Sequence, residues 1–549
     1  MTKKRLDGWF AVEIFMLLAF IAVLIYPLFG IIKQAVIMPD GSFTFEQFSK
    51  FFTNSYHFDT LKNSFRITIF VTILTLVIGI PFAYFYAFYR LKGAKILFVV
   101  SILCCMSAPF LGAYSWVMLL GRAGVITKFL KSAFGIITPT IYGFGGIALT
   151  QTLKFFPLVF IYMNGAFKNI DNTLMEASAN MGCVGVKRLF KVVLHLSMPT
   201  ILASALMVFM QAFADFGTPT VLGEGFKTFP VLLYNEYLGE NGSNYNFAAA
   251  LAVIAVLVTA VVFFFQKWAT NRFRFSMNAL HPVEKKEAKG LFGFLIHLYC
   301  YVLCGIAILP QLYIIYLSFR NCKGAVFSDG YSLVNYQQAF KKKLVMASRN
   351  TVIMGAVALI TIVIVAVIIA YLVVRRSSAM SHALDTIAML PYIMPGAVIG
   401  IALLIAYGSK PFALTGTMTI MILSFIIRRM PYTIRSATAT LMQIPLSIEE
   451  ASISLGASKL KTFAQITVPM MSSGILSGAI LSWVSIVTEL SSSVILYSNK
   501  TATLTMQAYI YIGRGEYGTA AAFAAILTVI TAISLFIYMA VSKSEDVRL

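Results

Sequence analysis

The sequence predicts an all-α membrane protein with about twelve transmembrane helices in two homologous six-helix lobes. Three observations lead to this fold class. The 549 residues are 59% hydrophobic and only 12% charged, whereas a soluble domain is about half apolar and a quarter charged. Apolar runs long enough to cross a bilayer recur along the whole chain. A stretch of the first half also returns in the second half in one fixed register.

The predicted spans are continuous apolar runs. Residues 9–32 and 351–374 match the roughly 20 apolar residues that a helix needs to cross the hydrocarbon core. These runs lack the period-2 alternation of barrel strands, and lipid admits only helices or closed barrels. We therefore expect helical spans near 9–32, 67–88, 96–120, 140–166, 197–221, 246–266, 291–318, 350–374, 384–407, 412–427, 469–495 and 518–541.

Basic residues in the loops set the expected orientation. Lys and Arg closely flank several spans, as in "MTKKR", "YRLKGAK" and "QKWATNRFRF", which places Met1 in the cytoplasm by the positive-inside rule. The excess on that side is modest, and the segment 341–349 runs against it. The first apolar run is longer than a typical signal peptide core, so we expect it to remain as the first span. The net charge of +22 is scattered over the loops, which favours contact with the lipid bilayer and argues against a nucleic-acid partner.

The internal repeat divides the chain into two halves. A shift of 274 residues (450 minus 176) aligns "EASANMGCV" at 176–184 with "EASISLGAS" at 450–458. Parallel repeats of six spans predict a pseudo-twofold axis along the membrane normal, with a pathway between the lobes. The predicted organisation is an N-terminal transmembrane lobe at 1–266, a cytoplasmic linker at 267–290 and a C-terminal transmembrane lobe at 291–549.

Each copy of the repeated segment is predicted to be a helix of about two turns. Thr173 to Glu176 and Ser447 to Glu450 have the spacing of a capping box, in which hydroxyl and carboxylate satisfy free N–H groups. A glycine follows each copy where a glycine commonly ends a helix. One copy alone is compatible with a structural turn between spans, whereas two equivalent copies favour a pair of helices that dock onto a twofold partner. The small residues that would allow close approach are Ala177, Ser178, Ala451 and Ser452.

The same segments resemble a known motif. Glu-Ala-small, a Gly six residues after the Glu, and a later apolar-Pro stretch are similar to the EAA loop of permeases in ATP-binding-cassette (ABC) importers, as in "EASISLGASKLKTFAQITVP". The first copy departs from this pattern because His195 stands where the proline is expected, and the next proline is Pro199. Over nearly its whole length, the chain most resembles fused two-lobe permeases of the ferric-iron transporter group, whose relatives include thiamine, phosphonate and sugar-phosphate importers.

This resemblance implies a type I ABC importer permease fold in a bacterial cytoplasmic (inner) membrane. The implied partners are two copies of an ABC ATPase subunit, which would carry ATP and Mg, and an extracytoplasmic substrate-binding protein. The chain itself has no G-x-x-x-x-G-K-[ST] phosphate loop, so we expect no enzymatic activity, no cofactor and no metal site in it. The residues that the resemblance assigns to ATPase coupling are Glu176, Ala177, Ser178, Gly182, Glu450, Ala451, Ser452 and Gly456.

Two carboxylates lie deep in predicted spans. Asp215 and Glu489 are related by the 274-residue shift, whereas Glu13 and Asp385 lie near span ends, where their side chains can reach the interface. An intramembrane carboxylate is costly and usually faces a bundle interior or a water-filled cavity. Two interpretations stay open: a translocation path or gate for a cationic or polar solute, and helix capping or interhelical hydrogen bonding without substrate contact. The neighbouring residues assigned to the candidate path are Gly217, Ser491 and Ser492.

Three arginines are predicted in the loop before the second repeated helix. At Arg428, Arg429 and Arg435, anchoring to lipid headgroups is favoured over contact with substrate.

Two functions fit these observations. The first is the permease subunit of an ATP-driven, binding-protein-dependent importer working by alternating access, for ferric iron or a small phosphorylated or phosphonate solute, with thiamine also compatible. The alternative is a six-plus-six-helix secondary transporter coupled to a proton or sodium gradient through Asp215 and Glu489. The repeated helix favours the importer, because a gradient-driven carrier needs no pair of ATPase-docking elements.

Overall fold

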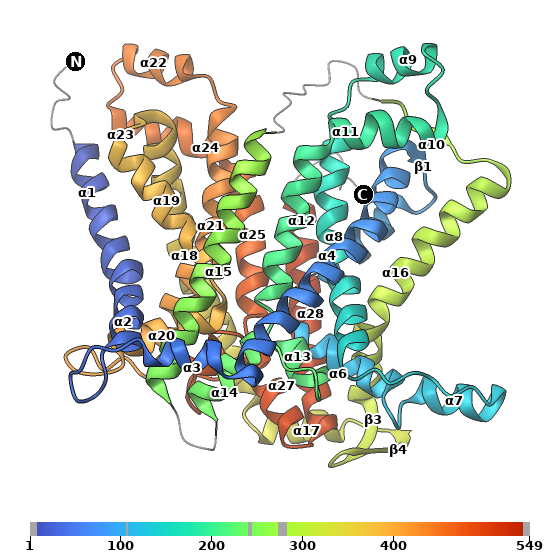
Figure 1. The fold of residues 1–549 in the computed structure, drawn as a ribbon. Helices are drawn as coiled ribbons and strands as arrows, with labels where there is room; N and C mark the ends of the chain where they lie inside the picture. The colour runs from blue at the N-terminus through green and yellow to red at the C-terminus, as the bar shows by residue number, and fades with distance from the viewer. Residues whose placement is uncertain (1–7, 106–107, 240–243, 273–282, 542–549) are drawn as a thin grey trace. The chain divides into compact units, whose positions relative to one another are not determined.

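A computed structural model of the chain describes residues 8–105, 108–239, 244–272 and 283–541. The described chain is almost entirely helical (Figure 1), with two small two-stranded sheets. Within these described ranges, eight helices are long and apolar enough to cross a membrane, and three bent helix pairs raise this number to eleven if each pair is one span. The prediction of an all-α membrane fold is therefore confirmed, with spans close in number to the twelve expected.

The predicted span at 384–407 is a bent helix pair, and in two further bent pairs a helix that precedes the predicted span at 197–221 or 469–495 joins it at an angle. The break at Met394 has a local cause, because Pro395 follows it and disfavours the helical conformation at the preceding residue, which is extended (φ −91°, ψ 134°). Hydropathy alone does not reveal such a break, since apolar residues continue on both sides. The pairs are Gly185–Leu196 with Met198–Phe213 (76°), Ala379–Ile393 with Gly396–Tyr407 (113°), and Lys459–Met470 with Ser472–Val487 (69°).

The predicted span at 412–427 is wrong in its bounds. The helix there runs over Met418–Met442, so the three arginines predicted in a loop lie inside it. The predicted span at 96–120 is divided between two short helices, Ala94–Cys105 and Pro109–Leu120.

The chain forms two compact units that are not its two sequence halves. Unit 1 comprises Met1–Phe48, Glu236–Ala255 and Ser318–Leu549, and unit 2 comprises Ser49–Asn235 and Val256–Leu317. The first span of each half thus belongs to the unit built mainly from the other half. The predicted lobes at 1–266 and 291–549 describe the repeat along the chain and differ from these units. Residues 273–282 of the predicted linker lie outside the described residues.

Unit 1 is built around three long helices, α18, α21 and α25. Its antiparallel hairpin pairs Arg320 with Tyr331. The elements, with η for a π-helix, are α1 Gly8–Phe20, η1 Ile21–Ile25, α2 Tyr26–Val36, β3 Arg320–Lys323, β4 Val326–Tyr331, α17 Val334–Lys341, α18 Leu344–Tyr371, η3 Leu372–Arg376, α19 Ala379–Ile393, α20 Gly396–Tyr407, α21 Met418–Met442, α22 Leu446–Ser454, α23 Lys459–Thr462, η4 Phe463–Thr467, α24 Val468–Met470, α25 Ser472–Val487, α26 Ser493–Leu496, α27 Leu504–Gly513 and α28 Tyr517–Val541.

Unit 2 is built around the corresponding helices α4, α8 and α12. Its short parallel pair places Tyr89 beside Lys286. The elements are α4 Ser55–Phe88, β1 Tyr89–Arg90, α5 Ala94–Cys105, α6 Pro109–Leu120, α7 Val125–Phe134, α8 Phe144–Lys168, α9 Asn172–Asn180, α10 Gly185–Arg188, η2 Leu189–Val193, α11 Leu194–Leu196, α12 Met198–Phe213, α13 Gly217–Leu222, β2 Lys286–Glu287 and most of α16 Gly290–Phe319. Besides α16, whose last two residues belong to unit 1, three described helices cross the unit boundaries: α3 Glu46–Thr53, α14 Phe229–Leu238 and α15 Tyr245–Arg272.

The repeat inferred from sequence is present in the helices themselves. Adding 274 to the bounds of α8 gives 418–442, which are the bounds of α21. The same shift converts α9 into α22 and α12 into α25 without any change of length. Within unit 2, α9 lies at one end of α8 and α7 lies at the other (Figure 1). Within unit 1, α22 and α20 occupy opposite ends in the same way (Figure 1).

Aromatic rings and small residues hold these layers together. In unit 2, the Phe82 ring packs edge-on against Phe160 at 4.8 Å and against Phe156 at 5.7 Å. In unit 1, α21 and α25 approach closely where Gly478 lies, since a Cβ there would be 2.6 Å from the Cα of Thr433. Small residues let membrane helices approach in this way, because packing rather than hydrophobicity holds helices together in lipid.

This crossing yields a prediction. Replacing Gly478 with Leu forces α21 and α25 apart, and overpacking of this kind costs about 1–3 kcal/mol or more. The purified protein in detergent should therefore unfold at a lower temperature. The matched control is Gly305→Ala in α16, where an added Cβ would meet nothing within 4 Å. An unchanged melting temperature for the Gly478→Leu variant would show that this contact does not hold the unit together.

Candidate functional site

The first repeated helix, α9, is capped by a residue two positions before the predicted cap, Thr173. Asp171 is its N-cap, and the Asp171 carboxylate accepts hydrogen bonds from the backbone N–H (2.9 Å) and hydroxyl (2.8 Å) of Thr173. Glu176 instead accepts a bond from the side chain of Asn172 at 2.7 Å. The predicted capping box is wrong because Thr173 is already the second residue of the helix.

The second copy, α22, starts directly after Pro445. No side chain at this N-cap position accepts a hydrogen bond from the first turn. Ser447 is the second residue of this helix, so its predicted capping box with Glu450 is also wrong. Proline fixes its own φ and needs no N–H partner, which suits it to the beginning of a helix.

The prediction that a glycine ends each repeated helix is confirmed. Gly182 (φ 71°) and Gly456 (φ 93°) each follow the helix by two residues and take left-handed conformations that other residues adopt at a cost. The next residue closes the turn in both copies, with Cys183 N–H to Ser178 O at 2.8 Å and Ala457 N–H to Ser452 O at 3.2 Å.

The exposed face of each helix differs from the one predicted. Ala177 and Ala451 are exposed beside the exposed Glu176 and Glu450. Ser178 and Ser452 are instead buried. Their hydroxyls bond inward, Ser178 to the Met175 carbonyl at 2.8 Å and Ser452 to the Thr462 hydroxyl at 2.9 Å. The two serines therefore hold the loop in shape rather than form its outer surface.

Large apolar side chains complete the outer surface, and sequence analysis did not single them out. Met181 is 86% exposed, and its equivalent Leu455 is 90% exposed. Val186 and Leu460, related by the same shift, are also strongly exposed. Exposed apolar side chains at matched positions of the two copies make these surfaces candidates for an interaction site. We name the two sets, Glu176, Ala177, Met181 and Val186 in unit 2 and Glu450, Ala451, Leu455 and Leu460 in unit 1, the docking surfaces.

A buried ion pair fixes α22 and was also missed. The Arg375 Nε atom lies 2.7 Å from Oε1 of Glu449, and its Nη2 donates to the Ile444 carbonyl at 2.8 Å. Both side chains are largely buried. The doubled acid at 449–450 and the doubled arginine at 375–376 were the available signals, but their separation in sequence hid the pairing.

The departure at His195 leaves the path of the loop unchanged. His195 lies in α11 and its counterpart Pro469 in α24, two elements that share their bounds under the shift. The following breaks bend by 76° and 69°. In both copies a π-helix precedes this segment and a new helix starts beyond it.

Asp215 lies between α12 and α13 and is buried. Its Oδ2 accepts hydrogen bonds from the Thr218 hydroxyl (2.6 Å) and from the Gln151 amide (3.1 Å). Its Oδ1 accepts from the Thr218 backbone N–H at 3.3 Å. Gly217 is the buried first residue of α13, so this carboxylate satisfies the start of the short helix.

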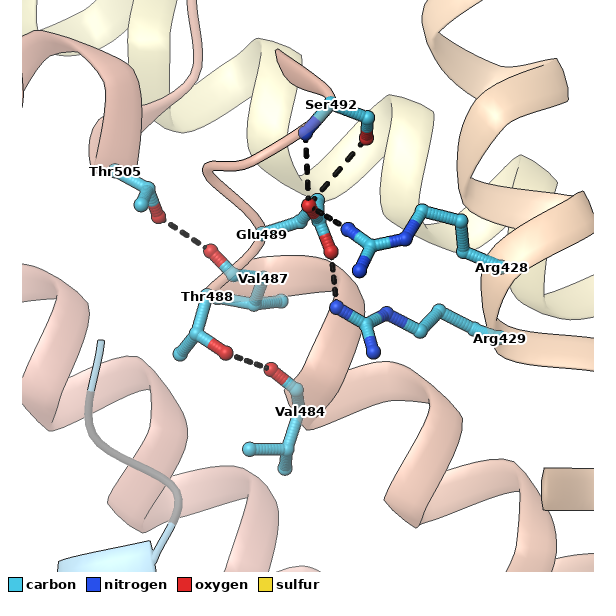
Figure 2. A network of polar contacts seen from close by, with 8 residues as sticks. All are labelled: Arg428, Arg429, Val484, Val487, Thr488, Glu489, Ser492 and Thr505. Carbon is cyan, nitrogen blue, oxygen red and sulfur yellow. Dashed lines mark hydrogen bonds and ion pairs between the residues drawn. The ribbon is translucent and has the colours of Figure 1, made fainter. Parts of the chain in front are cut away.

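Glu489 occupies the equivalent break between α25 and α26, as Figure 2 shows. Its Oε1 accepts from the Ser492 backbone N–H at 3.2 Å, and both of its oxygens form ion pairs, with Arg428 and Arg429. The prediction that these arginines bind lipid headgroups from a loop is wrong. They project from the middle of α21 onto a buried carboxylate, because an arginine inside a span needs a partner of opposite charge.

Other predicted interface residues are also paired inside unit 1. Arg435 on α21 lies 3.5 Å from the Asp385 carboxylate on α19. Glu13, which was expected to reach the interface, is buried, where Ser378 bonds to it and Arg376 lies 3.9 Å away. Ser491 is half-buried, and its Cβ would lie 2.6 Å from a Cβ added at Gly396.

The two carboxylates therefore share one geometry. Each accepts from the backbone N–H three residues ahead, at the break of a membrane helix. This arrangement supplies the capping that the second interpretation expected, whereas substrate contact stays a prediction. Among the described residues, no group of three or more His, Cys, Asp or Glu side chains is placed to hold a metal ion.

Comparison with known proteins agrees with this architecture. Residues 76–275 and 362–544 each match the family described as "Binding-protein-dependent transport system inner membrane component". The chain belongs to this family. The permease therefore contains two copies of the family's domain, one in each repeat, and it is a multi-pass membrane protein.

Individual relatives cover most of the permease. The "Ferric transport system permease protein FbpB" of Actinobacillus pleuropneumoniae is 30% identical over 90% of this chain and 73% of its own. A putative ferric transport system permease of Haemophilus influenzae is 29% identical over 87% of this chain and 76% of its own. A putative 2-aminoethylphosphonate permease of Salmonella typhi is 24% identical over 47% of this chain and 89% of its own.

The ion cluster in Figure 2 yields a prediction. Glu489→Gln leaves Arg428 and Arg429 buried without their shared carboxylate, and breaking a buried ion pair costs about 3–5 kcal/mol. Asp215→Asn should cost less, about 1–3 kcal/mol, because the partners of Asp215 are neutral. Thermal unfolding of the two purified variants measures the difference. Equal melting temperatures would contradict the assignment of Glu489 as the counter-charge.

Proposed function

We propose that the permease is the transmembrane subunit of an ATP-driven, binding-protein-dependent importer. Two copies of an ABC ATPase subunit, carrying ATP and Mg, bind the docking surfaces from the cytoplasm. An extracytoplasmic binding protein delivers the substrate on the opposite side. ATP binding and hydrolysis on the partners move α9 and α22, and the spans alternate between outward- and inward-facing states.

The docking surfaces carry this proposal. α9 and α22 have identical lengths, end at equivalent glycines and expose matched acidic, small and large apolar side chains. Two equal surfaces suit a partner that is present in two copies. Each surface combines an apolar centre, which gains free energy on burial, with a carboxylate that selects a basic groove.

Ferric iron is the substrate that the comparisons favour. Three relatives that cover 87–90% of this chain are named ferric transport permeases, a fourth that covers 80% is named without a substrate, and the phosphonate permeases align with 47%. A small phosphonate solute is therefore the second candidate.

The gradient-driven alternative is disfavoured by the environment of Glu489. A proton-coupled carrier needs a carboxylate that gains and loses a proton during its cycle. Glu489 is paired with two arginines and Asp215 caps a helix, so both carboxylates already have structural partners.

The test combines docking with transport in proteoliposomes. Replacing Met181 and Leu455 with Asp places a charge at the centre of each docking surface. We expect loss of ATPase co-purification and at least tenfold slower ATP-dependent ferric-iron uptake, since truncating or charging an interface centre costs about 2 kcal/mol or more.

The matched control is Val326→Asp, which charges a similarly exposed apolar residue on β4. This variant should retain both ATPase binding and uptake. Uptake that persists without nucleotide and collapses with the ion gradient would overturn the proposal in favour of a secondary transporter. Uptake of 2-aminoethylphosphonate in place of iron would overturn the substrate assignment alone.

A further inference from the structure

Helix α7 has no role in the import mechanism proposed above. It spans Val125–Phe134 in unit 2, between the end of α6 at Leu120 and the start of α8 at Phe144. None of its ten residues is buried. Adding 287 to the bounds of α6 gives those of α20, whereas 274 relates α8 to α21. The first half therefore has 13 more residues (287 minus 274) between these helices, and α7, which lies among them, has no counterpart helix in the described part of unit 1.

The two faces of α7 differ sharply in character. At 100° per residue, the apolar residues fall within one half of the helix circumference and the polar ones within the other. Val125 and Phe129 on the apolar face are 56% and 59% exposed. The apolar half is Val125, Ile126, Phe129, Leu130, Ala133 and Phe134, and the polar half is Thr127, Lys128, Lys131 and Ser132.

The chain after α7 extends the apolar face. Gly135 adopts a left-handed conformation (φ 65°), and the N–H of Ile136 returns to the Leu130 carbonyl at 3.2 Å. This turn leaves Ile136 and Ile137 exposed, Ile137 by 87%. At the other end, Arg122 fixes the start of α7 to unit 2 through an ion pair with Glu224 at 2.7 Å.

The position of α7 identifies what covers its apolar face. α8 has 25 residues, so its two ends are about 37 Å apart, close to the thickness of a bilayer with its interfaces. α9 follows one end of α8, and α7 precedes the other. In Figure 1, α7 extends sideways rather than along α8, and it continues α6, with which it forms the apolar segment Phe110–Phe134 that also passes the length and hydropathy test for a span. If α8 spans the bilayer, a helix that leaves unit 2 at this end of α8 lies near the membrane surface.

We propose that α7, with Ile136 and Ile137, is a membrane-interface element of unit 2 that binds anionic phospholipid. Its apolar half enters the acyl chains, and Lys128 and Lys131 lie among the phosphates of the headgroups. A strongly two-faced helix with basic residues on its polar face lies in the plane of the interface in this way. Each lysine near an anionic surface strengthens the attraction about fivefold. The element holds this end of unit 2 at a fixed depth, whichever side of the membrane it faces.

The test uses the full permease in vesicles of phosphatidylglycerol and phosphatidylethanolamine, with a nitroxide attached to the thiol introduced by Phe129→Cys or Lys128→Cys. The unsubstituted chain, labelled in parallel, gives the background of its six native cysteines. Both positions are exposed on α7, so neither substitution disturbs a core. We expect the label at 129 to collide more often with oxygen than with a water-soluble nickel chelate, and the label at 128 to show the reverse ratio.

A second measurement tests the charge. In Lys128→Gln/Lys131→Gln, the depth of the label at 129 should no longer increase when phosphatidylglycerol replaces phosphatidylcholine. The matched control, Lys33→Gln/Lys341→Gln, removes two exposed lysines elsewhere and should keep the lipid dependence.

Two results would overturn the proposal. If both labels are reached by oxygen and not by nickel, α7 continues α6 as a transmembrane segment. If the label at 129 is open to nickel in vesicles and becomes shielded only when purified binding protein is added, α7 is a protein-docking helix.

Discussion

A membrane helix cannot be broken without leaving backbone N–H groups that no water will satisfy, and this constraint organises the permease. Each unit contains such a break after its third core helix, between α12 and α13 or between α25 and α26. Asp215 and Glu489 stand at these breaks and accept the N–H three residues ahead. The carboxylates make short helices possible at membrane depth, so any role in translocation builds on a structural one.

The two units compensate differently for the free-energy cost of burying these carboxylates. Asp215 receives only neutral donors, from Gln151 and Thr218. Glu489 is shared by Arg428 and Arg429, which leaves that cluster with a net positive charge. The loops at the other end are also held differently. The buried pair of Arg375 with Glu449 supports α22, whereas α9 relies on its Asp171 cap. A fused chain allows this divergence, because its two halves evolve separately while presenting equal surfaces to a symmetric partner.

Sequence reasoning predicted the features that depend on local chemistry. The long apolar runs, the repeat and the glycine stops of α9 and α22 follow from burial, register and the backbone freedom of glycine. Features that depend on distant partners were missed. Arg428 looked like a loop residue because the apolar run ends at Ile427, and only its pairing with Glu489 shows that the helix continues. The predicted starts of α9 and α22 differ from the observed ones, because the residues at the N-cap are Asp171 and Pro445 rather than Thr173 and Ser447. The first span of each half packs in the unit formed mainly by the other half, and no periodic pattern in the sequence indicates this arrangement.

The central claim is that both docking surfaces face the cytoplasm and are covered by ATPase subunits. Labelling of Met181→Cys and Leu455→Cys with a membrane-impermeant thiol reagent tests it directly, in right-side-out and inside-out vesicles. The account predicts labelling of both positions in inside-out vesicles only, and protection of both when purified ATPase is added. Labelling in right-side-out vesicles, or labelling that the ATPase leaves unchanged, would contradict it.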